Sequence, residues 1–306
     1  MKKSILRPAR LCASAPKNGD GEQLQLGLMG AEDVVRVPFL KWAGRKTRIL
    51  SVLKPLLPPD GRRLIEPFVG SGAVFLNTDY PRAVLADSNA DLIHLFELLR
   101  DNGEQFIQQC QRLFSPESNQ EGKFYDLREE FNQCRDKSRR SALFIYLNRH
   151  CFNGLCRYNA SGNFNTPFGR YDKPYFPKAE MREFSAKLDG TDLYVQDFRQ
   201  TMAGAKRGDV VYCDPPYLPL SATANFTAYA AGGFGAEAQQ ELATACEAAA
   251  SRGATVVISN HDTDLGRKIY GGADRIVSLM VARMISCDGA NRNKAKELIA
   301  VYGART

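Results

Sequence analysis

The chain has 306 residues, of which 44% are hydrophobic and 25% charged, with a formal net charge of +7. This composition is ordinary for a folded protein with one large domain or two modest ones. No apolar run approaches the roughly 18 residues that span a bilayer. The basic first residues lack the apolar stretch and cleavage site of a secretory signal. We therefore expect a cytoplasmic protein that is not embedded in a membrane.

Short apolar runs alternate with helical periodicity along most of the chain. Residues 1–33 are the exception at the start: their low hydrophobicity and lack of a period predict a flexible tail. The predicted strands are 64–65, 83–86, 193–195, 210–212, 254–258, 275–281 and 298–302. The predicted helices between them are 42–56, 89–99 and 236–252. The alternation predicts an α/β fold with a doubly wound parallel sheet, and the last two strands predict a terminal hairpin.

Residues 90–178 interrupt this alternation, because they contain no strand of the same type. Helical patterns occupy 103–114, 123–134 and 138–148, and a segment rich in glycine, asparagine and aromatic residues follows. We therefore predict a discontinuous core made of residues 34–89 and 179–306. Residues 90–178 form the predicted inserted lobe.

The end of this lobe concentrates the positive charge of the chain. Residues 135–178 contain nine lysines and arginines and two acidic residues, an excess of seven that equals the net charge of the whole chain. Aromatic residues are interleaved with the basic ones. A basic stretch can simply be a solvated face. Mixed with aromatic residues, asparagine and glycine, it is more typical of a surface that binds nucleic acid.

A glycine turn follows the first predicted strand, and it predicts a nucleoside-containing cofactor. Gly70 and Gly72 allow a tight turn and a close approach of the backbone to a ligand, although such turns also serve only as connections. Asp87 ends the next strand, where its carboxylate can accept hydrogen bonds from ribose hydroxyls. The turn lacks a phosphate-binding lysine, which argues against an NTP-driven enzyme. The acidic residues favour cationic S-adenosylmethionine over NAD.

The segment upstream of this turn contains the only tryptophan, Trp42, and a basic residue, Lys46. Trp42 is either a core aromatic or one wall of the cofactor site. In the second case, Lys46 would face the carboxylate of a methionine moiety.

The tetrapeptide Asp214-Pro215-Pro216-Tyr217 is the most informative motif of the chain. It follows an apolar run that predicts a buried strand, and two prolines must end that strand in a stiff turn. Ligands of α/β folds bind at this edge of the sheet. A carboxylate, a backbone carbonyl and an aromatic face together suit a planar amine. The alternative is a turn that merely ends the strand.

The eight cysteines include no Cys-x-x-Cys pair. Free thiols in a reducing compartment account for them better than a zinc site made of His150, Cys151 and Cys156. We predict that the protein binds no metal.

Together these motifs resemble the Dam-type DNA adenine-N6 methyltransferases of the alpha arrangement, over about residues 37–303. The shared segments occur in the order of the family. They are 39–46, 66–72 and 214–217, and, in common with members that read GATC, 147–149, 153–159, 167–171, 220–229 and 258–262. The resemblance implies a Rossmann-like methyltransferase sheet with an inserted, mainly helical DNA-recognition lobe that carries a hairpin-like basic and aromatic segment.

The resemblance also implies roles for individual residues. The implied catalytic residues are Asp214, Pro215, Pro216 and Tyr217. The residues predicted to bind the cofactor are Trp42, Lys46, Glu66, Pro67, Phe68, Gly70, Gly72, Asp87, Asp197, Phe198 and Asp214. The residues predicted to bind DNA are Lys41, Phe152, Asn153, Leu155, Arg157, Asn159, Pro167, Arg170 and Tyr171.

The reaction implied is methyl transfer from S-adenosylmethionine to adenine N6 in double-stranded DNA, within GATC, after the base is flipped out. We expect a monomer associated with the nucleoid. Methylation of RNA or of a protein glutamine, and an inactive DNA-binding regulator, are the alternatives. Two positions depart from the family pattern: Arg45 stands where a glycine is more usual, and Phe152 replaces a tyrosine.

Overall fold

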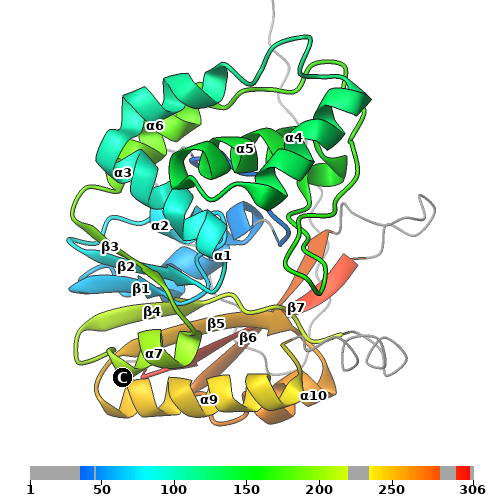
Figure 1. Cartoon of the computed structure of the whole chain (residues 1–306). Helices are drawn as coiled ribbons and strands as arrows, with labels where there is room; N and C mark the ends of the chain where they lie inside the picture. The colour runs from blue at the N-terminus through cyan, green and yellow to red at the C-terminus, as the bar shows by residue number, and fades with distance from the viewer. Residues whose placement is uncertain (1–34, 45, 220–233, 283–293, 304–306) are drawn as a thin grey trace, which may run out of the picture. The chain divides into compact units, whose positions relative to one another are not determined.

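A seven-stranded sheet forms the centre of the fold (Figure 1). In a computed structural model of the chain, residues 35–44, 46–219, 234–282 and 294–303 are described. The strands are β1 (Arg63–Glu66), β2 (Ala83–Asp87), β3 (Thr191–Val195), β4 (Asp209–Cys213), β5 (Thr255–His261), β6 (Arg275–Ala282) and β7 (Lys294–Tyr302). All seven predicted strands are confirmed, with ends that differ by a few residues.

The order of the strands fixes where a ligand can bind. The sheet runs β3-β2-β1-β4-β5-β7-β6, and the strands β1 to β5 are parallel to one another. From β1 the chain adds β2 and β3 towards one edge of the sheet. The next strand, β4, lies on the other side of β1, and the later strands extend the sheet towards the opposite edge. β1 and β4 are adjacent, so the loops that follow them diverge and leave a crevice. The predicted terminal hairpin is confirmed, because β7 pairs antiparallel with β5 and with β6.

The central strands are buried on both faces, as expected for parallel strands that are covered by helices. Every residue of β4 is buried. Val210 and Tyr212 belong to one hydrophobic cluster, and Val211 and Cys213 belong to the other. This alternation follows from the two-residue period of a strand.

Helices cover both faces of the sheet (Figure 1). On one side lie α2 (Ala73–Leu76), α3 (Ala90–Gln111) and α6 (Lys178–Lys187). On the other side lie α7 (Phe198–Ala203), α9 (Ala236–Ser251) and α10 (Asp264–Ile269). The helices α4 (Glu121–Gln133) and α5 (Lys137–His150) lie beyond α3, and α5 packs on it. Of the helices in the described residues, none combines the length and apolarity that a bilayer crossing requires.

The helix predictions were less accurate than the strand predictions. The predicted helix 42–56 is instead three short pieces, η1 (Lys46–Arg48), α1 (Leu50–Leu53) and η2 (Lys54–Leu56). Pro55 lies at the start of η2, and it cannot donate to a preceding turn. The predicted helices 89–99 and 103–114 are joined in α3, with a non-helical residue, Asn102, between them. The short helices α2, α6, α7 and α10 were not predicted.

The inserted segment shares its core with the sheet. One hydrophobic cluster includes Leu64 on β1, Leu92 on α3 and Leu143 on α5, all fully buried. The helix α3 also contacts β2 and β3 directly. The division of the chain at residues 90 and 178 therefore stays a prediction, and the predicted tail, residues 1–33, lies outside the described residues.

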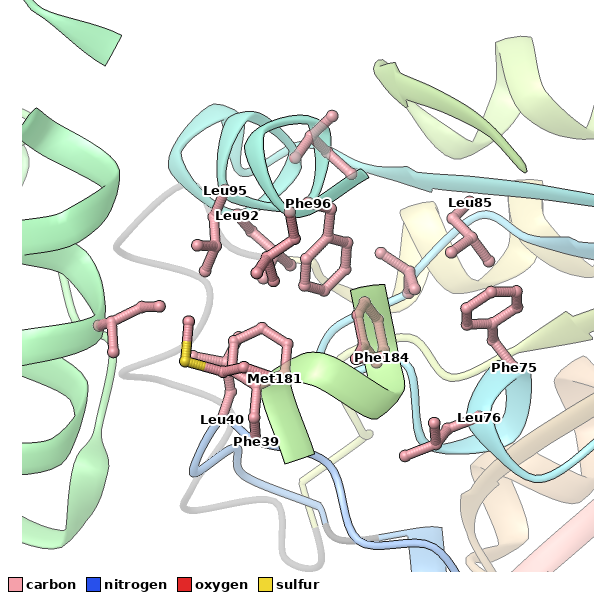
Figure 2. Packing of buried hydrophobic residues seen from close by; sticks show 14 of the residues in the cluster. Phe39, Leu40, Phe75, Leu76, Leu85, Leu92, Leu95, Phe96, Met181 and Phe184 are labelled. Atoms are coloured by element: carbon pink, nitrogen blue, oxygen red, sulfur yellow. The ribbon is translucent and has the colours of Figure 1, made fainter. Parts of the chain in front are cut away.

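Phe184 on α6 connects four parts of the chain (Figure 2). Its ring centroid lies 4.7 Å from that of Phe96 on α3, 5.7 Å from that of Phe75 on α2, and 5.2 Å from that of Phe39. A Cβ atom on Gly72 would lie only 2.7 Å from the Phe184 ring. The Phe184 ring therefore packs against the backbone of the turn that follows β1 and supports it.

We predict that Phe184→Ala destabilises the protein by about 3–5 kcal/mol, because the site is fully buried and rigid aromatic neighbours cannot fill the cavity. Urea unfolding, compared with the wild type, measures this loss. The control is Tyr194→Ala, which changes a half-exposed aromatic on the edge strand β3 and should cost roughly 1 kcal/mol or less. Equal losses in the two variants would contradict the supporting role of Phe184.

Candidate active site

A cavity of about 700 Å³ opens at the divergence of the loops that follow β1 and β4. The end of β2 and the segment around Trp42 complete its wall. Its lining includes Trp42, Gly44, Lys46, Glu66, Phe68, Gly70, Ser71, Asp87, Tyr212, Asp214, Pro215, Pro216 and Tyr217. The topology of the sheet thus brings together the glycine turn and the Asp214–Tyr217 turn, which are far apart in the sequence.

The glycine turn is shaped by two residues that require the absence of a side chain. Gly70 has φ +48°, and a Cβ atom there would lie 2.7 Å from Trp42 Nε1. Gly72 has φ +68° and precedes α2. Both φ values lie in the left-handed region that favours glycine. The indole of Trp42 therefore packs directly on the backbone of the turn.

Asp87 holds the glycine turn in place from the end of β2. Its Oδ2 accepts a hydrogen bond from Gly70 N at 3.1 Å, and its Oδ1 accepts one from Asn89 N at 3.0 Å. Burial raises the pKa of this carboxyl, and the backbone N–H groups partly oppose that effect. Each oxygen retains a further lone pair that can face a ligand.

Glu66 at the end of β1 is a buried carboxyl group, only 2% exposed. Its Oε1 accepts a hydrogen bond from Phe75 N at 2.6 Å. Burial raises its pKa to about 8, against the lowering effect of that hydrogen bond. At neutral pH, Glu66 is therefore mostly protonated and can donate a hydrogen bond into the cavity.

Asp214 lies at the centre of a small polar network. Its Oδ1 is 2.9 Å from Lys46 Nζ and accepts a hydrogen bond from Ser259 Oγ at 3.2 Å. Tyr212 Oη lies 2.9 Å from the same Ser259 hydroxyl. Burial raises the pKa of Asp214, and the Lys46 ammonium opposes this effect. Lys46 itself is buried, and its ammonium also donates to the Gly44 carbonyl at 3.1 Å.

The turn after Asp214 is fixed by side chains from neighbouring elements. Gln239 on α9 donates its Nε2 to the Pro216 carbonyl at 2.6 Å. Leu218 N donates to Asn260 Oδ1 at 2.9 Å. Tyr217 donates its hydroxyl to Glu297 Oε2 at 3.1 Å. The two prolines stiffen the turn locally, and these three bonds tie it to α9, β5 and β7.

Sequence reasoning missed the supporting residues Tyr212, Gln239, Ser259, Asn260 and Glu297. Ser259 and Asn260 lie within the shared segment 258–262, which could have indicated their importance. Gln239 and Glu297 carry no local signal, because their partners lie 23 and 80 residues away along the chain.

The structure brings seven of the eleven predicted cofactor-binding residues to the cavity wall. They are Trp42, Lys46, Glu66, Phe68, Gly70, Asp87 and Asp214. Pro67, Gly72, Asp197 and Phe198 do not line it. The Phe198 ring stacks on that of Phe68, with 5.5 Å between centroids, so it supports a lining residue. The Asp197 side chain caps α7 and pairs with Arg199 at 2.9 Å.

Comparison with known proteins identifies the family. Residues 42–284 match the family of D12 class N6 adenine-specific DNA methyltransferases. The chain belongs to this family. The DNA adenine methylases of Salmonella typhi and Escherichia coli K12 are each 50% identical over 264 residues, which cover 86% of this chain and 94% of the relative. The DNA adenine methylase of Serratia marcescens is 49% identical over 86% of this chain and 97% of its own length.

The reaction of this D12 class enzyme is methylation of adenine N6 in DNA, as the resemblance predicted. The match to a solved structure of a Thermoplasma acidophilum protein covers 80% of this chain and 70% of that one, with 11% identity and a TM-score of 0.30. The segment 220–229 and Arg45, both singled out in the sequence, lie outside the described residues.

The predicted DNA-binding residues of this methyltransferase lie on or beside one hairpin-like segment of the inserted region. Antiparallel bridges join Cys151 to Phe168 and Tyr158 to Phe164. Phe152 N donates to the Pro167 carbonyl at 2.8 Å. Leu155 N donates to the Phe152 carbonyl at 3.2 Å, at the start of the first arm of the hairpin. Phe152 is 50% exposed, in the short helix η3 (Phe152–Gly154).

Asn153, which follows Phe152, and Arg170 have positive φ values of 53° and 52°. Arg170 is exposed, with its guanidinium 3.5 Å from Glu121. The Asn159 side chain accepts hydrogen bonds from Ser161 N and Asn163 N, both at 3.0 Å, and so shapes the tip of the hairpin.

Lys41 lies next to this segment, although it precedes it by more than 100 residues. Asn148 is buried, and it donates to the Lys41 carbonyl at 2.7 Å and accepts from Lys41 N at 2.9 Å. The Lys41 ammonium lies 3.9 Å from the centroid of the Tyr171 ring. The guanidinium of Arg157 is held by Asn165, through bonds of 2.7 and 3.2 Å.

The zinc alternative finds no geometric support. His150 is buried, and its Nδ1 contacts the Tyr146 carbonyl at 2.8 Å. Burial lowers the pKa of His150 to about 4. Within the described ranges, no three histidine, cysteine or acidic side chains are grouped as a metal site would require.

The raised pKa of Glu66 predicts a pH dependence of stability. Its carboxyl titrates near 4.5 when unfolded and near 8 when folded. Between these pH values the unfolded chain loses a proton that the ligand-free folded chain keeps, so the free energy of unfolding decreases as the pH rises. Glu66→Gln should lessen this decrease by a few kcal/mol. Urea unfolding of both proteins at pH 5 to 8.5 measures it, and parallel curves would contradict the buried protonated state.

Proposed function

We propose that this enzyme takes its methyl group from S-adenosylmethionine and methylates the adenine of GATC in double-stranded DNA. The adenine leaves the duplex and receives the methyl group by direct in-line transfer. The observation that carries the proposal is the position of the Asp214–Tyr217 turn, which lines the same cavity as Gly70 and Asp87.

The cavity residues suit S-adenosylmethionine. Asp87 offers lone pairs to the ribose hydroxyls, and Trp42 offers a flat wall. Lys46 uses two of its three N–H donors on Gly44 and Asp214, which leaves one for the carboxylate of the methionine moiety. Asp87 and Asp214 favour a positively charged sulfonium. When bound, the cofactor supplies a methyl group that is already electrophilic.

The hairpin-like segment suits extrusion of a base. Removing adenine from a duplex costs roughly a few kcal/mol in lost pairing and stacking. Phe152 presents a half-exposed ring beside the strained residue Asn153, where it can enter the gap left by the base. Stacking of a base on an aromatic ring contributes about 1–3 kcal/mol, so Phe152 and Tyr217 can offset most of the cost.

The two oxygens of Asp214 have different roles in the proposed reaction. Lys46 and Ser259 both contact Oδ1 and so fix the orientation of the carboxylate. Oδ2 and the Pro215 carbonyl then accept the two N6–H bonds of the adenine. This arrangement directs the nitrogen lone pair towards the methyl group. It also stabilises the positive charge that develops on N6, and Asp214 is positioned to accept the proton that N6 must lose.

Recognition of guanine is assigned to Arg157. The Asn165 bonds use Nε and one hydrogen of Nη2. Nη1 and the remaining hydrogen of Nη2 can donate to O6 and N7 of guanine, a contact that discriminates by about 1–3 kcal/mol. Contact with the same recognition sequence is proposed for Lys41 and Tyr171, whose side chains lie together.

We predict that Asp214→Ala lowers kcat by about 100- to 1000-fold or more, because it removes the acceptor for the amine. Methyl incorporation into a GATC duplex measures this loss. The variant should still bind the duplex. It should also still cause the increase in 2-aminopurine fluorescence that reports extrusion of the target base, because neither step needs the carboxylate. Asp192→Ala, at an exposed position on β3, is the control. Near-normal turnover of Asp214→Ala would refute the assignment.

Arg157→Ala should relax the sequence preference at one position of the site. Rates are measured on GATC duplexes and on duplexes in which each base pair is replaced in turn. The wild type should prefer GATC, and the variant should lose about 1–3 kcal/mol of discrimination at a single guanine. Arg135→Ala, another exposed arginine of the inserted region, is the control. A loss of the same size on every sequence would instead indicate a phosphate contact.

A further inference from the structure

The hydroxyl of Tyr217 is bound by the C-terminal hairpin of the sheet. It donates to Glu297 Oε2 on β7 at 3.1 Å. Glu297 is the register partner of His261 on β5, so both side chains project from the same face of the sheet. The His261 ring meets the Tyr217 ring with 4.8 Å between centroids and an interplanar angle of 76°. Glu297 and His261, which are cross-strand neighbours, therefore both contact the side chain of Tyr217.

Glu297 is an unusual residue for its place in the sheet. The next five residues of β7, 298–302, are all buried and mostly apolar, whereas Glu297 is only partly covered. A partly buried carboxylate within a strand is costly unless a hydrogen bond satisfies it. Burial raises the pKa of the Tyr217 phenol, so the hydroxyl keeps its proton and is the donor of that bond.

The bond also affects the electronic character of the ring. A phenol that donates to a carboxylate is polarised, so its ring becomes richer in electrons. The Lys46 ammonium lies 4.5 Å from the centroid of the Tyr217 ring, which shows that the site already places a cation against it. An adenine that acquires positive charge at N6 during methyl transfer would be stabilised by the same ring.

We propose that Glu297 is a positioning residue for methyl transfer, which acts through the Tyr217 hydroxyl to fix the ring that receives the extruded adenine. The inference rests on the stacking role proposed for Tyr217. It assigns a part in the reaction to the antiparallel hairpin β6–β7, which contributes no residue to the cavity wall among those described.

A double-mutant cycle tests this inference. Glu297→Ala and Tyr217→Phe should each lower kcat by about ten- to a hundred-fold, with a smaller change in the KM for a GATC duplex. Because both changes remove one interaction, the double variant should be no slower than the slower single variant. Glu297→Gln should recover part of the rate, because its amide oxygen accepts the hydroxyl hydrogen without the negative charge.

Two controls separate the possible failures. Glu247→Ala removes an exposed carboxylate on α9 and should leave kcat unchanged. Tyr217→Ala removes the ring itself: normal turnover in that variant would refute the stacking role. Slow turnover in Tyr217→Ala, combined with a normal rate in Glu297→Ala, would refute only the inference about Glu297. The inference about Glu297 would also be refuted if the fold-losses in kcat of Glu297→Ala and Tyr217→Phe multiplied in the double variant.

Discussion

The parallel pairing of β1 with β4 is the constraint on which the site depends. Leu64 pairs with Val210, and Ile65 pairs with Val211, so the two strands end at the same edge of the sheet. The turn after β1 and the turn after β4 line the same cavity. Their loops diverge because the chain continues to opposite edges of the sheet. A displacement of this pairing by one residue would reverse the facing of every side chain on a strand.

The charge of the cavity depends on the different hydrogen-bond and ion-pair partners of its three carboxyl groups. Within the part of the chain that the structure describes, one backbone N–H donates to the deeply buried Glu66, which remains mostly protonated near neutral pH. Asp87 is bound by two backbone N–H groups, and Asp214 by Lys46 and Ser259. The same functional group, a carboxyl, thus provides a hydrogen-bond donor at one point of the cavity and an acceptor at another. Neighbouring groups, not the side chain itself, decide which.

The Asp214–Tyr217 turn is held in place largely by side chains from other elements. Two prolines limit its backbone locally, but Gln239, Asn260 and Glu297 bind its carbonyl, amide and phenol groups from three different elements. A site that must align a weak nucleophile with a methyl donor benefits from such fixed geometry, because alignment is what the protein can contribute. The hairpin that follows β5 therefore supports this turn through Glu297, and it also forms an edge of the sheet.

The sequence by itself determined the strands, the Asp214–Tyr217 turn, the glycine turn and the family. Apolar runs of two to seven residues and pairs of prolines or glycines act locally, so they can be recognised without tertiary structure. The predicted helix around Pro55 was wrong because periodicity was weighed above the missing N–H of the proline, and the use of Asp197 as a helix cap was not predicted. Only the tertiary structure decided that Lys46 meets Asp214 and that Glu297 meets Tyr217. Those partners are distant along the chain, so only the folding of the whole chain brings them together.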